Sequence, residues 1–162
     1  MARFRAALVA AAVLAGAGGA GAAPLLAFSN STDPDKAYRI DFVGPSPIVG
    51  VTLLLDRPSD VLVQFTSGAT AETTEGCPCS VGAFLRMDGG ALLPVKRINL
   101  GSRAATTQAG HVRDRQSLDG SLVFPAAEAG PHTFELVAQQ VSGRSVDLRI
   151  YHPNLQAIAF PR

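Results

Sequence analysis

The chain has 162 residues, of which 47% are hydrophobic, and it carries a formal net charge of +1 and no tryptophan. This length fits one domain with a core of ordinary size. The near-neutral balance gives no general attraction for nucleic acid or for an anionic membrane surface, so we expect neither as a partner.

Residues 1–22 have the order of a secretory signal peptide. Arg3 and Arg5 precede the apolar run AALVAAAVLAGAG, and small residues follow to Ala22, where we place the cleavage. A membrane span needs about 20 apolar residues, and no second apolar run follows, so we expect no span in the mature chain. Removing two arginines lowers Lys+Arg from 14 to 12 against 13 Asp+Glu, which gives a net charge of −1. We therefore expect a secreted or periplasmic protein.

Residues 23–36 are predicted to be an extended lead-in and residues 37–162 a single β-sandwich domain. Alternation of apolar and polar residues with period two is typical of half-buried strands. It is clearest in residues 60–65, 132–138 and 145–151. The inward positions predicted for these segments are Val61, Val63, Phe65, Phe134, Leu136, Ala138, Val146, Leu148 and Ile150.

Further short strands are predicted where apolar runs are bounded by glycine, proline or aspartate. Asp88-Gly89-Gly90 and Asp119-Gly120 are candidate hairpin turns, because glycine supplies the positive φ that primed turns require. Residues 68–76 and 99–110 are predicted to be polar loops. The pattern favours an all-β fold, an antiparallel sandwich or barrel. The additional strands are residues 37–43, 48–55, 81–87, 92–98, 111–117, 121–124 and 155–160.

The two cysteines, Cys77 and Cys79, flank Pro78. In an oxidising compartment a disulfide between them is the simplest interpretation, and Pro78 can shorten the Cα–Cα distance of about 6–7 Å expected for a straight strand. A zinc site would need four ligands, and a redox site would show Cys-x-x-Cys before a helix. We therefore predict no metal site and no cofactor. A strained regulatory disulfide, an intermolecular bridge and capture of a soft metal are the alternatives.

Sequence signatures of catalysis are missing. There is no Gly-x-Ser-x-Gly, no His-Glu-x-x-His and no glycine-rich phosphate loop. Isolated histidines such as His132 and His152 are more typical of hydrogen-bonded structural residues than of catalytic ones. We predict no catalytic residues and a non-enzymatic protein.

Residues 111–117 offer candidate ligand-binding residues. His111, Arg113 and Arg115 share one face of this predicted strand. Arginine presents a planar fork of donors, so the strip is suited to a carboxylate, sulfate or phosphate group. The competing interpretation is an edge strand kept polar to discourage aggregation.

The segments GCPCSVGAFLRMDGG, RDRQSLDGSLVFPAAEAGPHTFELVAQQVSG and VDLRIYHPNLQAIAF resemble small secreted bacterial β-sandwich proteins of unassigned function. The second half is also distantly similar to the jelly rolls of complement C1q and tumour necrosis factor domains. The resemblance implies a jelly-roll-like sandwich.

Three classes of function follow. The first is a secreted, non-enzymatic binding or structural module whose partner is an unknown extracellular ligand or a second copy. The second is a C1q/TNF-like oligomer in surface assembly or adhesion, burying an apolar strip that includes Tyr151, Ile158 and Phe160. The third is a hydrolase on a sandwich scaffold.

Overall fold

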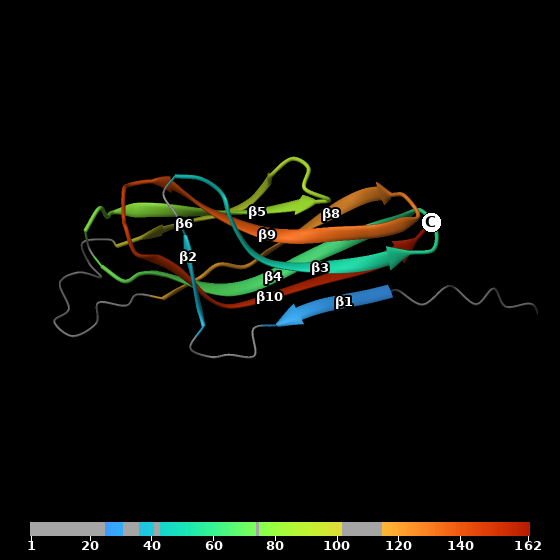
Figure 1. The fold of residues 1–162 in the computed structure, drawn as a ribbon, viewed down its shortest axis with the longest axis horizontal. Coiled ribbons are helices and arrows are strands. Elements are labelled where there is room, and N and C mark those ends of the chain that lie inside the picture. The colour runs from blue at the N-terminus through green and yellow to red at the C-terminus, as the bar shows by residue number, and fades with distance from the viewer. Residues whose placement is uncertain (1–24, 31–35, 41–42, 74, 102–114) are drawn as a thin grey trace, which may run out of the picture.

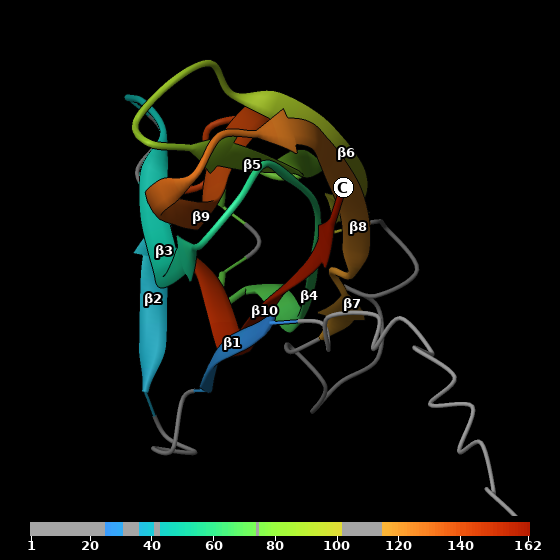
Figure 2. The same cartoon turned by 90° about the vertical axis from the view of Figure 1, so that its right-hand side faces the viewer.

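The computed structural model describes residues 25–30, 36–40, 43–73, 75–101 and 115–162. These residues form ten strands in two antiparallel sheets. Figure 1 shows most of the strands running along the long axis of the molecule, and Figure 2 shows the two sheets curving around a common interior. The described residues contain no helix long and apolar enough to cross a membrane.

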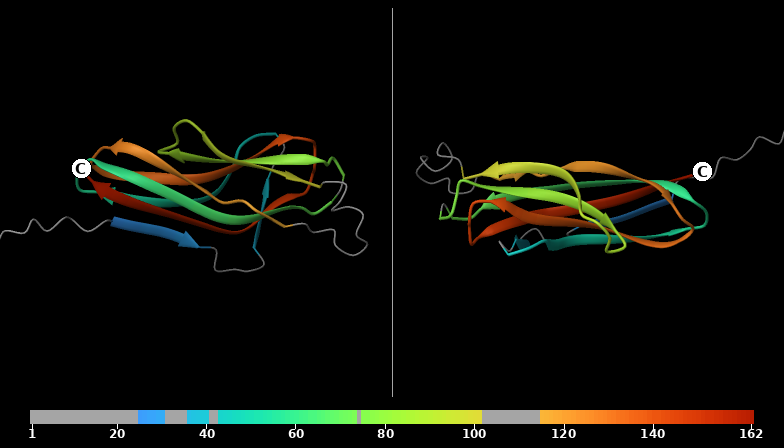
Figure 3. Two further views of the ribbon diagram at one scale, coloured as in Figure 1. Left: turned by 180° about the vertical axis from the view of Figure 1, so that it is seen from behind. Right: turned by 90° about the horizontal axis from the view of Figure 1, so that it is seen from above.

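Sheet A holds six strands and sheet B holds four. The strands of sheet A are β1 (Leu25–Asn30), β2 (Ala37–Ile40), β4 (Ser59–Ala71), β7 (Gln116–Ser117), β8 (Gly120–Ala127) and β10 (Leu148–Pro161). Those of sheet B, in the order in which they pair, are β3 (Ser46–Leu55), β9 (Gly130–Ser142), β5 (Cys79–Met87) and β6 (Leu93–Leu100). Figure 3 shows the two layers from behind and from above.

The strand order is that of a jelly roll. β1 and β2 pair with successive lengths of β10, and β7 and β8 pair with successive lengths of β4. If β1 and β2 are counted as one interrupted strand, and β7 and β8 as another, the described residues contain eight strands. Numbered in chain order, these strands lie first-eighth-third-sixth in sheet A and second-seventh-fourth-fifth in sheet B. This order is that of two Greek keys joined across two sheets. The prediction of a single antiparallel, jelly-roll-like β-sandwich is confirmed.

The core lies between the sheets and is filled by the inward positions of the alternating strands. Phe124 of β8 and Phe134 of β9 connect the two layers, with ring centroids 5.3 Å apart. Eight of the nine predicted inward positions are buried, which confirms the register expected from the alternation. These eight are Val61, Val63, Phe65, Phe134, Leu136, Ala138, Leu148 and Ile150.

Two predictions about the start of β10 are wrong. Val146, expected inward, is 45% exposed, because it precedes the strand. Tyr151, expected in an outward apolar strip with Ile158 and Phe160, is 8% exposed. The guanidinium carbon of Arg115 lies 4.3 Å from the centroid of the Tyr151 ring and covers it.

Three segments pair more extensively than expected. Residues 68–71, predicted to begin a loop, continue β4 because Gly68 and Ala71 find partners in Tyr151 and Leu148 of β10. The predicted strands 145–151 and 155–160 are parts of β10, which has a register shift between Tyr151 and Asn154. Residues 25–30, expected in the lead-in, form β1, so the sandwich begins before residue 37.

One predicted hairpin turn is confirmed and the other is wrong. Asp88 and Gly89 have φ of 52° and 70°, and the amide of Gly90 donates to the Met87 carbonyl at 2.9 Å, the pattern of a type I′ turn. Asp119-Gly120 makes no hairpin, because β7 and β8 both pair with β4. Between them Leu118 is buried, and its amide donates to the Ser67 carbonyl at 2.9 Å.

Candidate functional site

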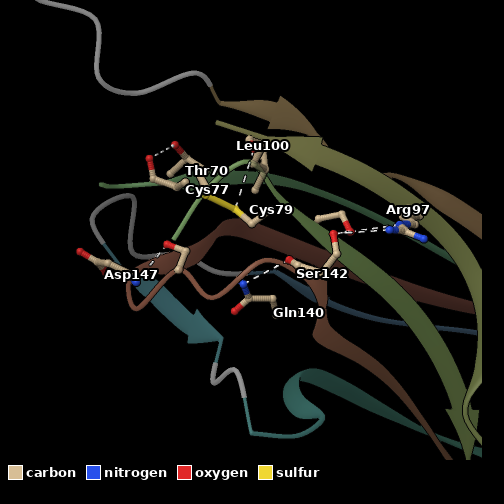
Figure 4. The surroundings of a disulfide bond; sticks show 11 residues. Thr70, Cys77, Cys79, Arg97, Leu100, Gln140, Ser142 and Asp147 are labelled. Atoms are coloured by element: carbon tan, nitrogen blue, oxygen red, sulfur yellow. Dashed lines mark hydrogen bonds between the residues drawn. A yellow bond between two sulfur atoms is a disulfide. The ribbon is translucent and has the colours of Figure 1, made fainter. Parts of the chain in front are cut away.

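Cys77 and Cys79 are joined in a disulfide, with their Cα atoms 4.4 Å apart (Figure 4). Cys79 is 2% exposed and belongs to the core. A Cβ atom placed on Gly101 or Gly143 would lie 2.6 Å from the Cβ atom of Cys77 or Cys79, respectively. The disulfide therefore packs between the end of β6 and the β9–β10 connection, and the absence of side chains at both glycines gives it room.

The predicted cationic strip is described in part. His111 and Arg113 lie outside the described residues, as does most of the predicted loop 99–110. Arg115 crosses Gly68, where an added Cβ would lie 2.6 Å from the arginine Cδ. Cation–π attraction accounts for its place on Tyr151. The described residues contain no group of three or more His, Cys, Asp or Glu side chains that could hold a metal ion.

An arginine pair lies on the outer face of sheet A near Tyr151. Arg149 of β10 stands directly opposite Arg39 of β2. Asp147 accepts hydrogen bonds from Nε and Nη2 of Arg149 at 2.8 and 3.1 Å, which raises the pKa of that guanidinium. Nη2 of Arg39 donates to the Val146 carbonyl at 2.7 Å.

The arginine pair borders an open hollow of about 380 Å³. The sequence showed no signal for this site, because β2 and β10 lie more than 100 residues apart and their pairing cannot be predicted from local pattern. The described residues that line the hollow are Ala37, Arg39, Thr73, Val146, Asp147 and Arg149.

At the other end of sheet A, four apolar side chains form a row across the strands, called the apolar row below. The ladder places Leu26 of β1 opposite Ile158 of β10, Ile158 opposite Leu62 of β4, and Leu62 opposite Val123 of β8. Leu26 is 58% and Val123 51% exposed, while Leu62 and Ile158 are half-buried. Phe160 alternates with buried Ala159 and is also exposed.

The polar residues beside the apolar row are paired. Asp60, opposite Phe160, forms an ion pair with Arg162 at 2.7 Å. Hydrogen bonds from Arg162, and then from the Ala126 amide, lower the pKa of the Asp60 carboxyl. On the other side, the side-chain amide of Gln156 donates to that of Gln64 at 2.6 Å.

His132 connects the β5–β6 turn to the start of β9. Its Nδ1 lies 2.7 Å from a carboxylate oxygen of Asp88, and its Nε2 lies 2.9 Å from the Glu128 carbonyl. Both partners are acceptors, so both ring nitrogens donate, and the contacts favour the imidazolium form. The hydrogen bond to Asp88 is the main cause of the raised pKa of His132. These contacts fit the structural role predicted for this histidine.

The strand order and the burial pattern define the class of the protein as a jelly-roll β-sandwich. No family model and no curated protein matches the chain. Solved structures of infectious bursal disease virus match it: the VP2 subviral particle (TM-score 0.46, 11% identity), the Gx strain (0.44, 11%) and the Gt strain (0.43, 13%). Each match covers 85% of this chain but 33%, 32% and 32% of the viral chains, so this chain spans about a third of their length.

Proposed function

We propose that the protein is an exported, non-enzymatic β-sandwich module that binds a second copy of itself through the outer face of sheet A. The apolar row is the observation that carries this proposal. Leu26, Ile158, Leu62 and Val123 stand in one register across four strands of that face.

The apolar row departs from the usual pattern of a solvent-facing sheet. An antiparallel sheet with one face in water normally alternates apolar residues inward with polar residues outward. Burying exposed apolar area is favourable by about 25 cal/mol per Å². Contiguous apolar side chains rimmed by polar ones are typical of interaction sites, and the row with Phe160 forms such a patch between Asp60 and the Gln64–Gln156 pair.

A second copy suits this face in shape and in charge. Twisted sheets pack face to face in many sandwiches, and a two-fold axis between two copies of sheet A sets each apolar row against the other. Asp60 and Arg162 neutralise each other beside the row, so two copies approach without repulsion there. A strongly charged partner would gain nothing from this half of the face.

Export is supported by the predicted signal peptide and by the disulfide, which persists in oxidising compartments. The C1q/TNF-like alternative would use the same outward residues, Ile158 and Phe160, in a ring. Tyr151 would not contribute to that strip, because Arg115 covers it.

Sedimentation velocity over a range of protein concentrations tests the proposal. The unmodified protein should change from the mass of one chain to that of two. Val123→Lys should keep it at one, because a lysine ammonium in the row would have to be desolvated.

Leu54→Lys is the matched control, since Leu54 is 70% exposed on β3 of sheet B. We expect it to leave the association unchanged. A protein that stays monomeric at every concentration, or that loses association equally with either lysine, contradicts the proposal. If the unmodified protein forms a trimer that Val123→Lys abolishes and Leu54→Lys does not, the apolar row is still the interface, but the assembly is a ring instead of a two-fold pair.

A further inference from the structure

We propose that the hollow between β2 and β10 binds an oxyanion, that is, a carboxylate, sulfate or phosphate group. The site uses Arg39, Arg149 and Thr73, and it is separate from the apolar row. Arg149 and Ile158 are nine positions apart on β10, which corresponds to roughly 30 Å along a strand.

The first observation is the arrangement of charge. Arg39 and Arg149 stand directly opposite each other in the antiparallel ladder, where like charges are unfavourable. Of the six described residues that line the hollow, Asp147 is the single acid, and both its oxygens accept from Arg149. These six residues together carry a net charge of +1, which an anionic group would neutralise.

The second observation is the set of donors still available. A guanidinium has five N–H donors, and Arg39 has one hydrogen bond among the described residues, to the Val146 carbonyl. Asp147 holds the Arg149 guanidinium in a fixed plane through its bidentate contact with Nε and Nη2, which uses one edge of the fork. A guanidinium that is already oriented loses less conformational freedom when its remaining donors bind a ligand.

The third observation is independent of charge. Thr73 lines the same hollow, and its Oγ1 is buried without a hydrogen-bond partner among the described residues. Buried hydroxyl groups in folded proteins are normally paired. Rotation about the Thr73 Cα–Cβ bond would turn this hydroxyl towards an oxyanion oxygen in the hollow, while the guanidinium groups supply the charge.

An NMR titration with inorganic sulfate tests the site, with sodium chloride adjusted to keep the ionic strength constant. We expect saturable shifts confined to Thr73 and to the side-chain Nε–H signals of Arg39 and Arg149. A parallel titration with a monosulfated disaccharide distinguishes a free ion from a group attached to a sugar. If sulfate and the disaccharide bind with equal affinity, the ligand is a free ion; if the disaccharide binds more tightly, the ligand is a group carried on a sugar.

Variants then separate the site from general charge. Arg39→Gln should weaken binding about tenfold or more, since it removes hydrogen bonds between charged groups. Arg39→Lys should weaken it less, because the charge stays and the fork is lost. Thr73→Val should also weaken binding by removing the hydroxyl. Arg57→Gln is the matched control: Arg57 is 52% exposed and lies outside the hollow, so binding should be unchanged.

The proposal is overturned if sulfate causes no saturable shift, or if Arg57→Gln weakens binding as much as Arg39→Gln. Arg39→Gln should leave the concentration-dependent mass unchanged. Failure of the oxyanion site and failure of self-association are therefore seen in different variants and different measurements.

Discussion

Neighbouring residues on β9 have opposite surroundings although they differ by one position in the chain. Leu136 is fully buried between the sheets. Glu135 faces outward and pairs with Arg86 of β5 at 2.6 Å, where both side chains are 24% exposed. Partly exposed ion pairs stabilise little compared with a buried leucine, so the two positions should respond very differently to truncation.

Leu136→Ala should lower the free energy of unfolding by about 2–5 kcal/mol, because it leaves a cavity in the core. Glu135→Ala should lower it by about 1 kcal/mol or less. Urea denaturation of both variants measures the two values. Similar losses at both positions would mean that the register of β9 is wrong.

His132 makes stability depend on pH. Its pKa is raised chiefly by the hydrogen bond to Asp88. A raised pKa in the folded state means that the stabilisation is complete below the unfolded value of 6.5 and is lost as pH rises through the folded value. Burial raises the pKa of Asp88, but hydrogen bonds from His132 and Thr133 outweigh it and lower the pKa overall, so Asp88 stays ionised in mild acid.

The destabilisation caused by His132→Gln should therefore be larger at about pH 5.5 than at about pH 8.5. We expect the difference between the two conditions to be about 0.2–1 kcal/mol, the range of a partly exposed ion pair. Thermal unfolding of both proteins at the two pH values measures it. A loss that stays constant with pH would show that the imidazolium is not favoured in the folded state.

At the scale of elements, the disulfide turn packs against the glycines at the end of β6 and after β9. A loop this short contributes about 1.5 kcal/mol by the chain-entropy formula. Cys79 is 2% exposed, so a serine there would bury a hydroxyl in an apolar site. The choice of replacement at Cys79 therefore matters more than at Cys77, which is half-buried.

Replacing Cys77 by Ser and Cys79 by Ala should lower the free energy of unfolding by about 1–2 kcal/mol. Replacing both by Ser should lower it by about 1–3 kcal/mol more, because the Leu100 carbonyl lies 3.9 Å from the Cys79 Sγ, too far for a good hydrogen bond from a buried serine hydroxyl. Chemical denaturation compares the two double variants. If the two double variants are equally stable, the Cys79 side chain is exposed to water. If thiol titration of the unmodified protein, unfolded without a reducing agent, finds two free thiols, the disulfide is excluded.

Elements with a strong local pattern could be predicted from the sequence, and elements fixed by distant partners could not. Val61, Val63 and Phe65 alternate with polar residues, so β4 and its register follow from the residues themselves. Asp88-Gly89 predicts its own turn. By contrast, the chain continues through Asp119-Gly120 because both flanking segments pair with β4, which no local signal records.

The candidate sites show the same limit. Arg39 and Arg149 become a pair only when β2 joins β10, and the apolar row needs four strands in register. The pattern of residues 111–117 places Arg115 on one face of its strand, but its contact with Tyr151 depends on the position of β10. Local periodicity gives the face on which a side chain lies, and the sheet order decides which other side chains it meets.

At the scale of the whole molecule, the two ends of sheet A differ in chemistry. One end holds the arginine pair and its hollow, and the other holds the apolar row. One outer edge of sheet B is protected, because β6 carries Pro94, Lys96 and Arg97, residues that discourage strand addition. Association through a sheet face is therefore the more favourable route for this fold than association through the β6 edge.

Solvent exposure of individual methyl groups tests association through this face most directly. A soluble, uncharged paramagnetic reagent relaxes the methyl groups that it can reach. In dilute protein, the reagent should reach the methyls of the apolar row and those of Leu54, a residue of sheet B that is 70% exposed. In concentrated protein, we predict that Leu26, Leu62, Val123 and Ile158 become protected while Leu54 stays accessible. If the methyl groups of these four residues relax equally at both concentrations, the face remains in water and the proposed association is contradicted.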